Sequence, residues 1–338
     1  MKIFINANII TLDSDNKRAN AMVVDDNGKI MAIGNKDEIE KKYNKQIEKS
    51  IDLENKTVIP GLNDSHLHLF QYGLSKTKVD LSESTSIADI IEKTKNYIKN
   101  NELKKNEWIQ GKGWNDENFD DSSFPTVEDL DKISTDYPII LKRACFHVAA
   151  VNSKALELCG IDENTADPEG GKIGRKENGQ ADGLFYDEAI EILESRIPQK
   201  SIAEIKEILK ESFSDLLKKG LSSVQVDDFF NVEDPERILK SYLQLHEENE
   251  IPLRVTLQMR IPDKDRINEF KERGYISKSG DEFFKIGPVK LVLDGSLGAR
   301  TAALKEIYND KKTTNGTALY EQEKFNELAK HAVNNDFQ

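Results

Sequence analysis

Apolar and polar positions alternate in two different ways along the chain. Residues 3–10, 21–24 and 29–33 are short apolar stretches separated by turn-forming residues, a pattern that predicts strands. The Asn27-Gly28 step between two of these stretches is a strong hairpin signal, because both residue types accept a positive φ. Residues 1–55 are therefore predicted to form a small β domain.

From about residue 56, helical periodicity alternates with strand-like runs. An amphipathic helix over 205–217 should end near Gly220 and lead into a strand over 221–226. A helix around 238–243 precedes a strand over 253–259, and a helix from 267 precedes a strand over 288–293. With a first strand over 62–68, this order predicts an α/β fold whose parallel strands are wrapped by helices.

The stretch between the first and second of these strands is too long to be a loop. Residues 75–198 contain a helix of their own at 87–98 and strand-like pieces at 108–111 and 138–141. We interpret the stretch as an insertion that covers the mouth of the site. A last helix is expected over 325–333, followed by the beginning of a further strand.

Composition narrows the functional classes. The 338 residues are 37% hydrophobic and 32% charged, as expected for a soluble globular protein, and the formal net charge is -13. That charge argues against nucleic-acid binding, and no apolar run is long enough to span a membrane. Two cysteines are too few for a disulfide framework, so a cytoplasmic protein with a small-molecule substrate is expected. A homodimer is an open possibility.

The residues that could bind a metal lie in the first predicted parallel strand, over 62–68. Side chains alternate along a strand, so Asp64, His66 and His68 share one face. Two neutral imidazoles at the end of a barrel strand can bind one divalent cation, with further ligands from other strands. A bare His-x-His is more often structural. The preceding Pro60-Gly61, the nearby Asp64 and the upstream β domain favour a metal site here.

Several motifs in a fixed order resemble the amidohydrolase superfamily, and in particular its amidohydrolase-3 branch, which includes enzymes like N-substituted formamide deformylase. They are GKIMAIG at 28–34, VIPGLNDSHLH at 58–68, GKGW at 111–114, HVAAVNSKAL at 147–156, DPEGG at 167–171, GL at 183–184 and VKLVLDGSLG at 289–298. The resemblance implies a (β/α)8 TIM-type barrel with a small β-sandwich domain. It also implies a metal-dependent hydrolase with one or two metal ions, in which metal-activated hydroxide cleaves a non-peptide amide-like or formamide-like C–N bond. By ligand type we expect zinc, although imidazole and carboxylate also suit iron, manganese or nickel.

The resemblance also suggests roles for individual residues. Lys290 would join His66 and His68 as a metal ligand, as a carbamylated lysine does in many relatives; the residues alone equally allow a lysine paired with a carboxylate such as Asp294. His147 would contact substrate, although a surface or capping role is as compatible with its loop. Trp114 could wall the pocket, although a core aromatic is the commoner role. Asp64 and Asp294 would support the ligands.

The resemblance leaves part of the expected site unmatched. Two further histidines on later strands and a catalytic aspartate have no counterpart, and about half of an eight-stranded barrel is accounted for. We expect these 338 residues to be the N-terminal part of a longer protein and to have no hydrolase activity alone. The alternatives are a deaminase of the same superfamily with a single metal ion and a catalytically inactive scaffold.

Overall fold

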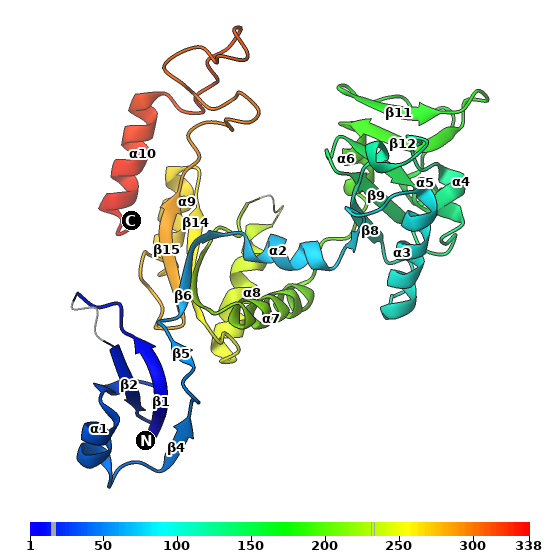
Figure 1. The fold of residues 1–338 in the computed structure, drawn as a ribbon. Coiled ribbons are helices and arrows are strands. Elements are labelled where there is room, and N and C mark those ends of the chain that lie inside the picture. Colours follow the sequence, from blue (N-terminus) through cyan, green and yellow to red (C-terminus); the bar gives the residue numbers. More distant parts are fainter. Residues whose placement is uncertain (15–17, 231, 233) are drawn as a thin grey trace.

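The computed structural model describes residues 1–14, 18–230, 232 and 234–338, and these residues form three sheets (Figure 1). A small β unit lies at the N-terminus, a parallel sheet with its helices follows, and the insertion forms a third unit. The α/β class expected from the sequence is confirmed by the order of the elements.

The N-terminal unit is built on β1 (Lys2–Ile10). β2 (Arg18–Val24) pairs antiparallel with β1 and with β3 (Ile30–Gly34), and Gly28 in the connecting turn has a φ of 80°. The hairpin predicted at Asn27-Gly28 is therefore present. Helix α1 (Lys36–Tyr43) packs on this sheet, and β4 (Lys49–Asp52) and β5 (Thr57–Val58) run parallel to β1. The unit's small core consists of Ile3, Ala21, Val23 and Ile39.

The second unit, which we call the parallel unit, holds a four-stranded sheet in the order β15-β14-β13-β6. Its strands are β6 (Leu62–Leu67), β13 (Leu221–Val226), β14 (Arg254–Arg260) and β15 (Phe284–Lys290), all parallel. Its helices are α2 (Leu69–Lys76), α7 (Ile202–Lys218), α8 (Pro235–Glu247), α9 (Lys264–Glu272) and α10 (Gln322–Asn334). Four consecutive barrel-type strands agree with the sequence; a closed barrel stays a prediction.

The fourth strand lies about four residues earlier than predicted. The apolar run suggested 288–293, but β15 covers Phe284–Lys290. The reason is pairing: Phe284 lies opposite Val255 and Lys290 opposite Arg260, so hydrogen bonding to β14 sets both ends of the strand. Lys290 therefore lies at the end of its strand and not inside it, which changes what its side chain can reach.

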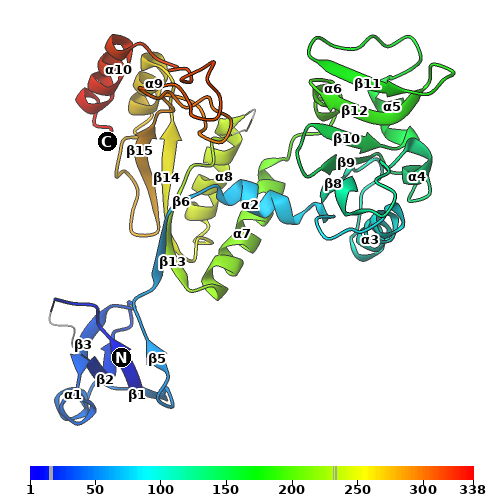
Figure 2. The same cartoon turned by 45° about the horizontal axis from the view of Figure 1, so that its top comes forward.

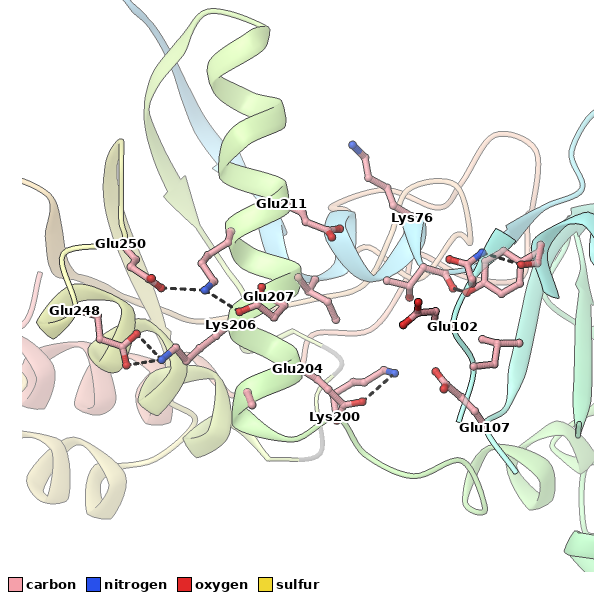
Figure 3. A pocket seen from close by; sticks show the side chains of 17 residues that line it. Lys76, Glu102, Glu107, Lys200, Glu204, Lys206, Glu207, Glu211, Glu248 and Glu250 are labelled. Atoms are coloured by element: carbon pink, nitrogen blue, oxygen red, sulfur yellow. Dashed lines mark hydrogen bonds and ion pairs between the residues drawn. The ribbon is translucent and has the colours of Figure 1, made fainter. Parts of the chain in front are cut away.

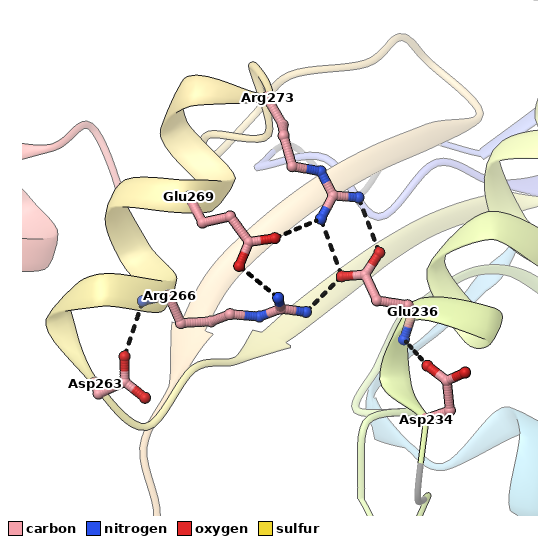
Figure 4. A network of polar contacts seen from close by, with 6 residues as sticks. All are labelled: Asp234, Glu236, Asp263, Arg266, Glu269 and Arg273. Carbon is pink, nitrogen blue, oxygen red and sulfur yellow. Dashed lines mark hydrogen bonds and ion pairs between the residues drawn. The ribbon is translucent and has the colours of Figure 1, made fainter.

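Helices α8 and α9 are joined on the outside of the parallel sheet by a network of ion pairs (Figure 4). Glu236 accepts hydrogen bonds from Arg266 and, at 2.9 and 3.0 Å, from Arg273; Glu269 bonds the same two arginines. Asp234 and Asp263 cap the two helices through backbone N–H groups. The arrangement holds the two helix starts, and hence the loops after β13 and β14, in a fixed relation.

The insertion has a mixed six-stranded sheet in the order β11-β12-β10-β9-β8-β7. Its strands are β7 (Val79–Asp80), β8 (Ile109–Trp114), β9 (Ile139–Arg143), β10 (Val148–Val151), β11 (Gly171–Arg175) and β12 (Ala181–Asp187). Its helices are α3 (Ile87–Asn100), a 3-10 turn at Asp116–Asn118, α4 (Val127–Asp131), α5 (Ser153–Cys159) and α6 (Ala189–Glu194).

The insertion stands beside the parallel unit, joined to it through α2 and the connection into α7 (Figures 1 and 2). The expectation that it covers the mouth of the site stays a prediction. The long loop after β15, orange in Figure 1, extends beyond the strand ends. Among the described residues, no helix is both long and apolar enough to cross a membrane.

Candidate metal centre

Two histidines and an aspartate meet where β6 and β13 end. His66 lies in β6, His68 is the residue that caps α2, and Asp227 directly follows β13. The N–H of Asp227 donates to the carbonyl of Leu67 at 2.9 Å, which holds the two strand ends together. One potential ligand atom from each of the three side chains lies within 4.8 Å of the others. These three residues can therefore share one cation.

The imidazole of His68 is held in a defined orientation. Its Nδ1 lies 2.6 Å from the backbone carbonyl oxygen of Asp227, which can only accept, so Nδ1 carries the proton. That tautomer leaves the Nε2 lone pair for a metal, the usual arrangement for a metal-binding histidine. The ring of Phe230 packs against His68 with a centroid distance of 4.9 Å and restricts its rotation.

Asp227 carries the observation that points most directly to a cation. Its side chain is nearly fully buried, and within the described part of the chain its Oδ1 is buried without a hydrogen-bond partner. Its Oδ2 lies 3.7 Å from Nζ of Lys290. Buried carboxylate oxygens normally have partners, and an unpaired one beside two imidazoles fits a divalent ion. Two nitrogens and an oxygen also form a donor set suited to zinc.

Asp228, the next residue, connects the end of β13 to α2 and α8. It is fully buried; its Oδ1 accepts from the N–H of Phe70 at 3.1 Å and its Oδ2 from the hydroxyl of Tyr242 at 2.5 Å. Burial raises the pKa of Asp228 to about 6, against the effect of these hydrogen bonds. The contact to Phe70 fixes the first turn of α2, two residues after His68.

The residues predicted to support the ligands have different partners. Oδ1 of Asp64 accepts from the N–H of His66 at 3.0 Å, so Asp64 contacts the backbone of a candidate ligand. Oδ2 of Asp294 accepts from the N–H of Ala303 at 2.9 Å and belongs to the loop after β15. In place of a pair with Asp294, Lys290 contacts Asp227, because both residues lie at the carboxyl ends of parallel strands in the same sheet.

The two predicted substrate contacts lie in the insertion. Trp114 is fully buried, and its indole N–H donates to the carbonyl of Leu141 at 2.9 Å, so it packs in the core of the insertion. A role of Trp114 as a pocket wall stays a prediction. His147 is 75% exposed, and its Nδ1 lies 2.9 Å from Oδ1 of Asp187. Neither belongs to the group formed by His66, His68 and Asp227. Contact of His147 with substrate stays a prediction.

Sequence reasoning missed Asp227 and Asp228. The available signal was two consecutive acidic residues directly after the apolar strand 221–226, at the strand end where barrel enzymes place their chemistry. The two remaining histidines lie in α8 and α10. His246 lies 3.6 Å from Asp281, and His331 lies 2.8 Å from Asn268.

A cavity of about 740 Å³ lies between α7 and the insertion, and is lined by acidic residues and lysines (Figure 3). Most of these charges are paired: Lys210 with Glu207 and Glu250, and Lys206 with Glu248. None of His66, His68 or Asp227 lines this cavity. It is therefore separate from the candidate metal centre.

Comparison with known proteins identifies the family of this chain. The profile of the amidohydrolase family matches residues 49–338. YtcJ of Bacillus subtilis, provisionally named an amidohydrolase, is 33% identical over 96% of this chain, which covers 60% of YtcJ. The N-substituted formamide deformylase of Arthrobacter pascens is 28% identical over 66% of this chain, which covers 41% of that protein.

Two solved structures share the fold. They are uncharacterized metal-dependent hydrolases from Pyrococcus horikoshii and Pyrococcus furiosus, with TM-scores of 0.76 and 0.77 and identities of 27% and 28%. All of this chain aligns with 64% and 66% of those chains, so it spans about two thirds or less of its relatives' length. On the family profile, the relatives and the metal-type cluster together, this chain belongs to the amidohydrolase family.

Proposed function

We propose that this protein is a metal-dependent hydrolase that cleaves a non-peptide C–N bond of an amide or formamide, with His66, His68 and Asp227 as metal ligands. The single observation that carries the proposal is the buried, unpartnered Oδ1 of Asp227 beside two imidazoles. The name of the Arthrobacter relative favours N-substituted formamides as a first substrate class. Because the chain covers only part of its relatives, the activity is proposed for the protein at its relatives' length.

The residues of the centre have distinct tasks in this proposal. A divalent cation held there supplies Lewis acidity, which lowers the pKa of water and polarises a carbonyl. The Asp227 carbonyl keeps His68 in the tautomer that exposes Nε2, and Phe230 restricts its ring. Lys290, 3.7 Å from Asp227, either balances that carboxylate as an amine or, once carbamylated, becomes a further ligand. Asp64 steadies the backbone of His66.

Metal content tests the proposal directly. The protein is prepared as these 338 residues and at the full length of its gene, and each is analysed for bound metal and for hydrolysis of N-benzylformamide. We expect one or two equivalents of zinc or another divalent ion in the longer form, with turnover that a double His66→Ala, His68→Ala variant lacks. Absence of bound metal from both forms would contradict the proposal.

The count of metal ions and the state of Lys290 separate the hydrolase from a mononuclear deaminase. Two ions and a mass increase of one carbon dioxide on the peptide that contains Lys290 favour the binuclear hydrolase. One ion, an unmodified Lys290 and release of ammonia from an amino-substituted ring favour the deaminase.

A further inference from the structure

A pocket of about 380 Å³ at the ends of β14 and β15 has an unusual balance of charge. Its lining consists of Arg260, Pro262, Lys290, Leu291, Val292, Leu319, Tyr320 and Lys324. Three of these residues are cationic and none is acidic. The remaining wall is mostly apolar, so the pocket offers positive charge beside a hydrocarbon surface.

Two of the three charges in this pocket, those of Arg260 and Lys324, have no carboxylate partner among the described residues. Arg260 and Lys290 lie opposite each other as Cα partners on neighbouring strands, where like charges are destabilising. Arg260 packs its guanidinium over the ring of Phe230 at 5.0 Å and, within the described residues, has no carboxylate partner. Lys324 likewise has no ion pair in the described part of the chain. Its sequence neighbours Glu321 and Glu323 do not line the pocket.

The pocket adjoins the candidate metal centre along two routes. Lys290 lines the pocket, and its Nζ lies 3.7 Å from Oδ2 of Asp227. Arg260 lies over Phe230, whose ring in turn packs on His68 at 4.9 Å. A ligand in the pocket would therefore lie next to the group of His66, His68 and Asp227.

We propose that this pocket binds a carboxylate group of the substrate, with Arg260 and Lys324 as its charged contacts. The inference rests on the proposed function and narrows its substrate class to amides that carry a carboxylate, such as N-formyl or N-acyl amino acids. A carboxylate there relieves the repulsion between Arg260 and Lys290, and a guanidinium binds it through two parallel hydrogen bonds. The apolar wall receives the side chain, and the amide is directed toward the metal centre.

The test is calorimetric binding to the full-length protein after removal of metal, so that it needs no catalysis. The probes are N-acetylglycine, N-acetylmethionine and N-benzoylglycine, each compared with its neutral methyl ester. We expect the acid of at least one pair to bind about tenfold or more tighter than its ester, and Arg260→Gln and Lys324→Gln each to remove most of that preference. Arg260→Lys should restore part of it. Lys330→Gln, on the same helix as Lys324 but outside the pocket, is the matched control.

The outcomes separate this inference from the function on which it rests. Equal affinity for acid and ester in all three pairs, or an unchanged preference in both Gln variants, would overturn the carboxylate pocket. Hydrolysis of neutral formamides by the metal-loaded protein would still support the hydrolase in that case. Conversely, a carboxylate preference in a protein that binds no metal would leave the pocket intact and contradict the hydrolase.

Discussion

The insertion and the parallel unit use the same kinds of side chain in opposite ways. In the insertion, the indole N–H of Trp114 bonds the carbonyl of Leu141 and His147 lies beside Asp187. In the parallel unit, Oδ1 of Asp227 and Oε1 of Gln258 are buried without partners among the described residues, and Arg260 lies opposite Lys290 on the neighbouring strand. Among the described residues, the insertion pairs its fully buried polar side-chain atoms, whereas the parallel unit leaves two such oxygens unpaired on or just after its inner strands β13 and β14.

This difference indicates where binding free energy is available. A buried polar atom without a partner costs about 1–3 kcal/mol, which a ligand that supplies the partner can recover. The strand ends of the parallel unit carry such costs, at positions next to each other in the pairing of β13, β14 and β15. The insertion, in which no fully buried side-chain nitrogen or oxygen of a described residue lacks a hydrogen-bond partner, is better suited to a supporting role.

The largest effect on stability is expected from the insertion core. Replacing Trp114 with Ala removes a fully buried indole and should lower the free energy of unfolding of the insertion by about 3–5 kcal/mol. Metal affinity should change less than twofold, because Trp114 has no contact with the metal centre. Urea denaturation followed by fluorescence measures the first quantity and chelator competition the second. A large loss of metal affinity would break the comparison between the two units.

The next effect is expected at the metal centre itself. Asp227→Asn replaces the unpartnered carboxylate oxygen of a proposed ligand by a neutral amide oxygen. It should weaken zinc affinity by about 100-fold or more, because even groups that only support a ligand contribute about 10- to 100-fold. Competition with a fluorescent chelator measures this in the full-length protein. His147→Ala is the matched control in the insertion and should leave the affinity unchanged. Equal losses in the two variants would show that the cluster is not the binding site.

Tyr242→Phe tests the buried bond behind the centre. The change removes the hydroxyl that donates to Oδ2 of Asp228 and leaves a buried carboxyl oxygen without a partner. The free energy of unfolding should therefore fall by about 1–3 kcal/mol. Burial raises the pKa of Tyr242, so its hydroxyl remains a donor throughout the usual pH range. Chemical denaturation at pH 7 gives the value. An unchanged stability would mean that Asp228 finds another partner.

The smallest effect is expected from the ion-pair network between α8 and α9. Glu236→Gln should lower the free energy of unfolding by about 0.5–1 kcal/mol at low salt and by less at high salt. Metal affinity should not change. Hydrogen bonds from Arg273 lower the pKa of Glu236 from its ordinary value of 4.5. A lowered pKa means that the stabilisation is complete above pH 4.5 and is lost as the pH falls through the folded value. Melting temperatures of both proteins between pH 3 and 7 should therefore converge at the acidic end, and parallel curves would contradict the assignment.

Much of the fold followed from local patterns in the sequence. The helix predicted over 205–217 is observed as α7, with Ser201 and Glu204 forming its capping box, and the turn at Asn27-Gly28 joins β2 to β3. The fourth parallel strand was misplaced because its ends depend on pairing with β14, which no local pattern reveals. The position of the insertion beside the sheet depends on contacts of the same long-range kind.

The site was predicted in part. His66 and His68 were found because alternation along one strand places them on the same side, a property of the strand alone. Asp227 was missed because its closeness to His68 comes from the pairing of β13 with β6, across about 160 residues of chain. A ligand role for Lys290 stays a prediction. Its contact with Asp227 was missed because the suggested partner, Asp294, was sought among its sequence neighbours.

Helix α2 is a short connection between the parallel unit and the insertion. It begins directly after His68, which is its N-cap residue, and leads into the insertion. Its eight residues span about 12 Å. Tyr72 and Lys76 both bond Asp215 of α7, and any side chain larger than hydrogen at Gly73 would overlap Ser212 and Ile208. Helix α2 is thus held against α7 along most of its length. A movement of the insertion could displace His68 through α2 only if these contacts with α7 were broken. The position of the imidazole should therefore change little when the insertion moves.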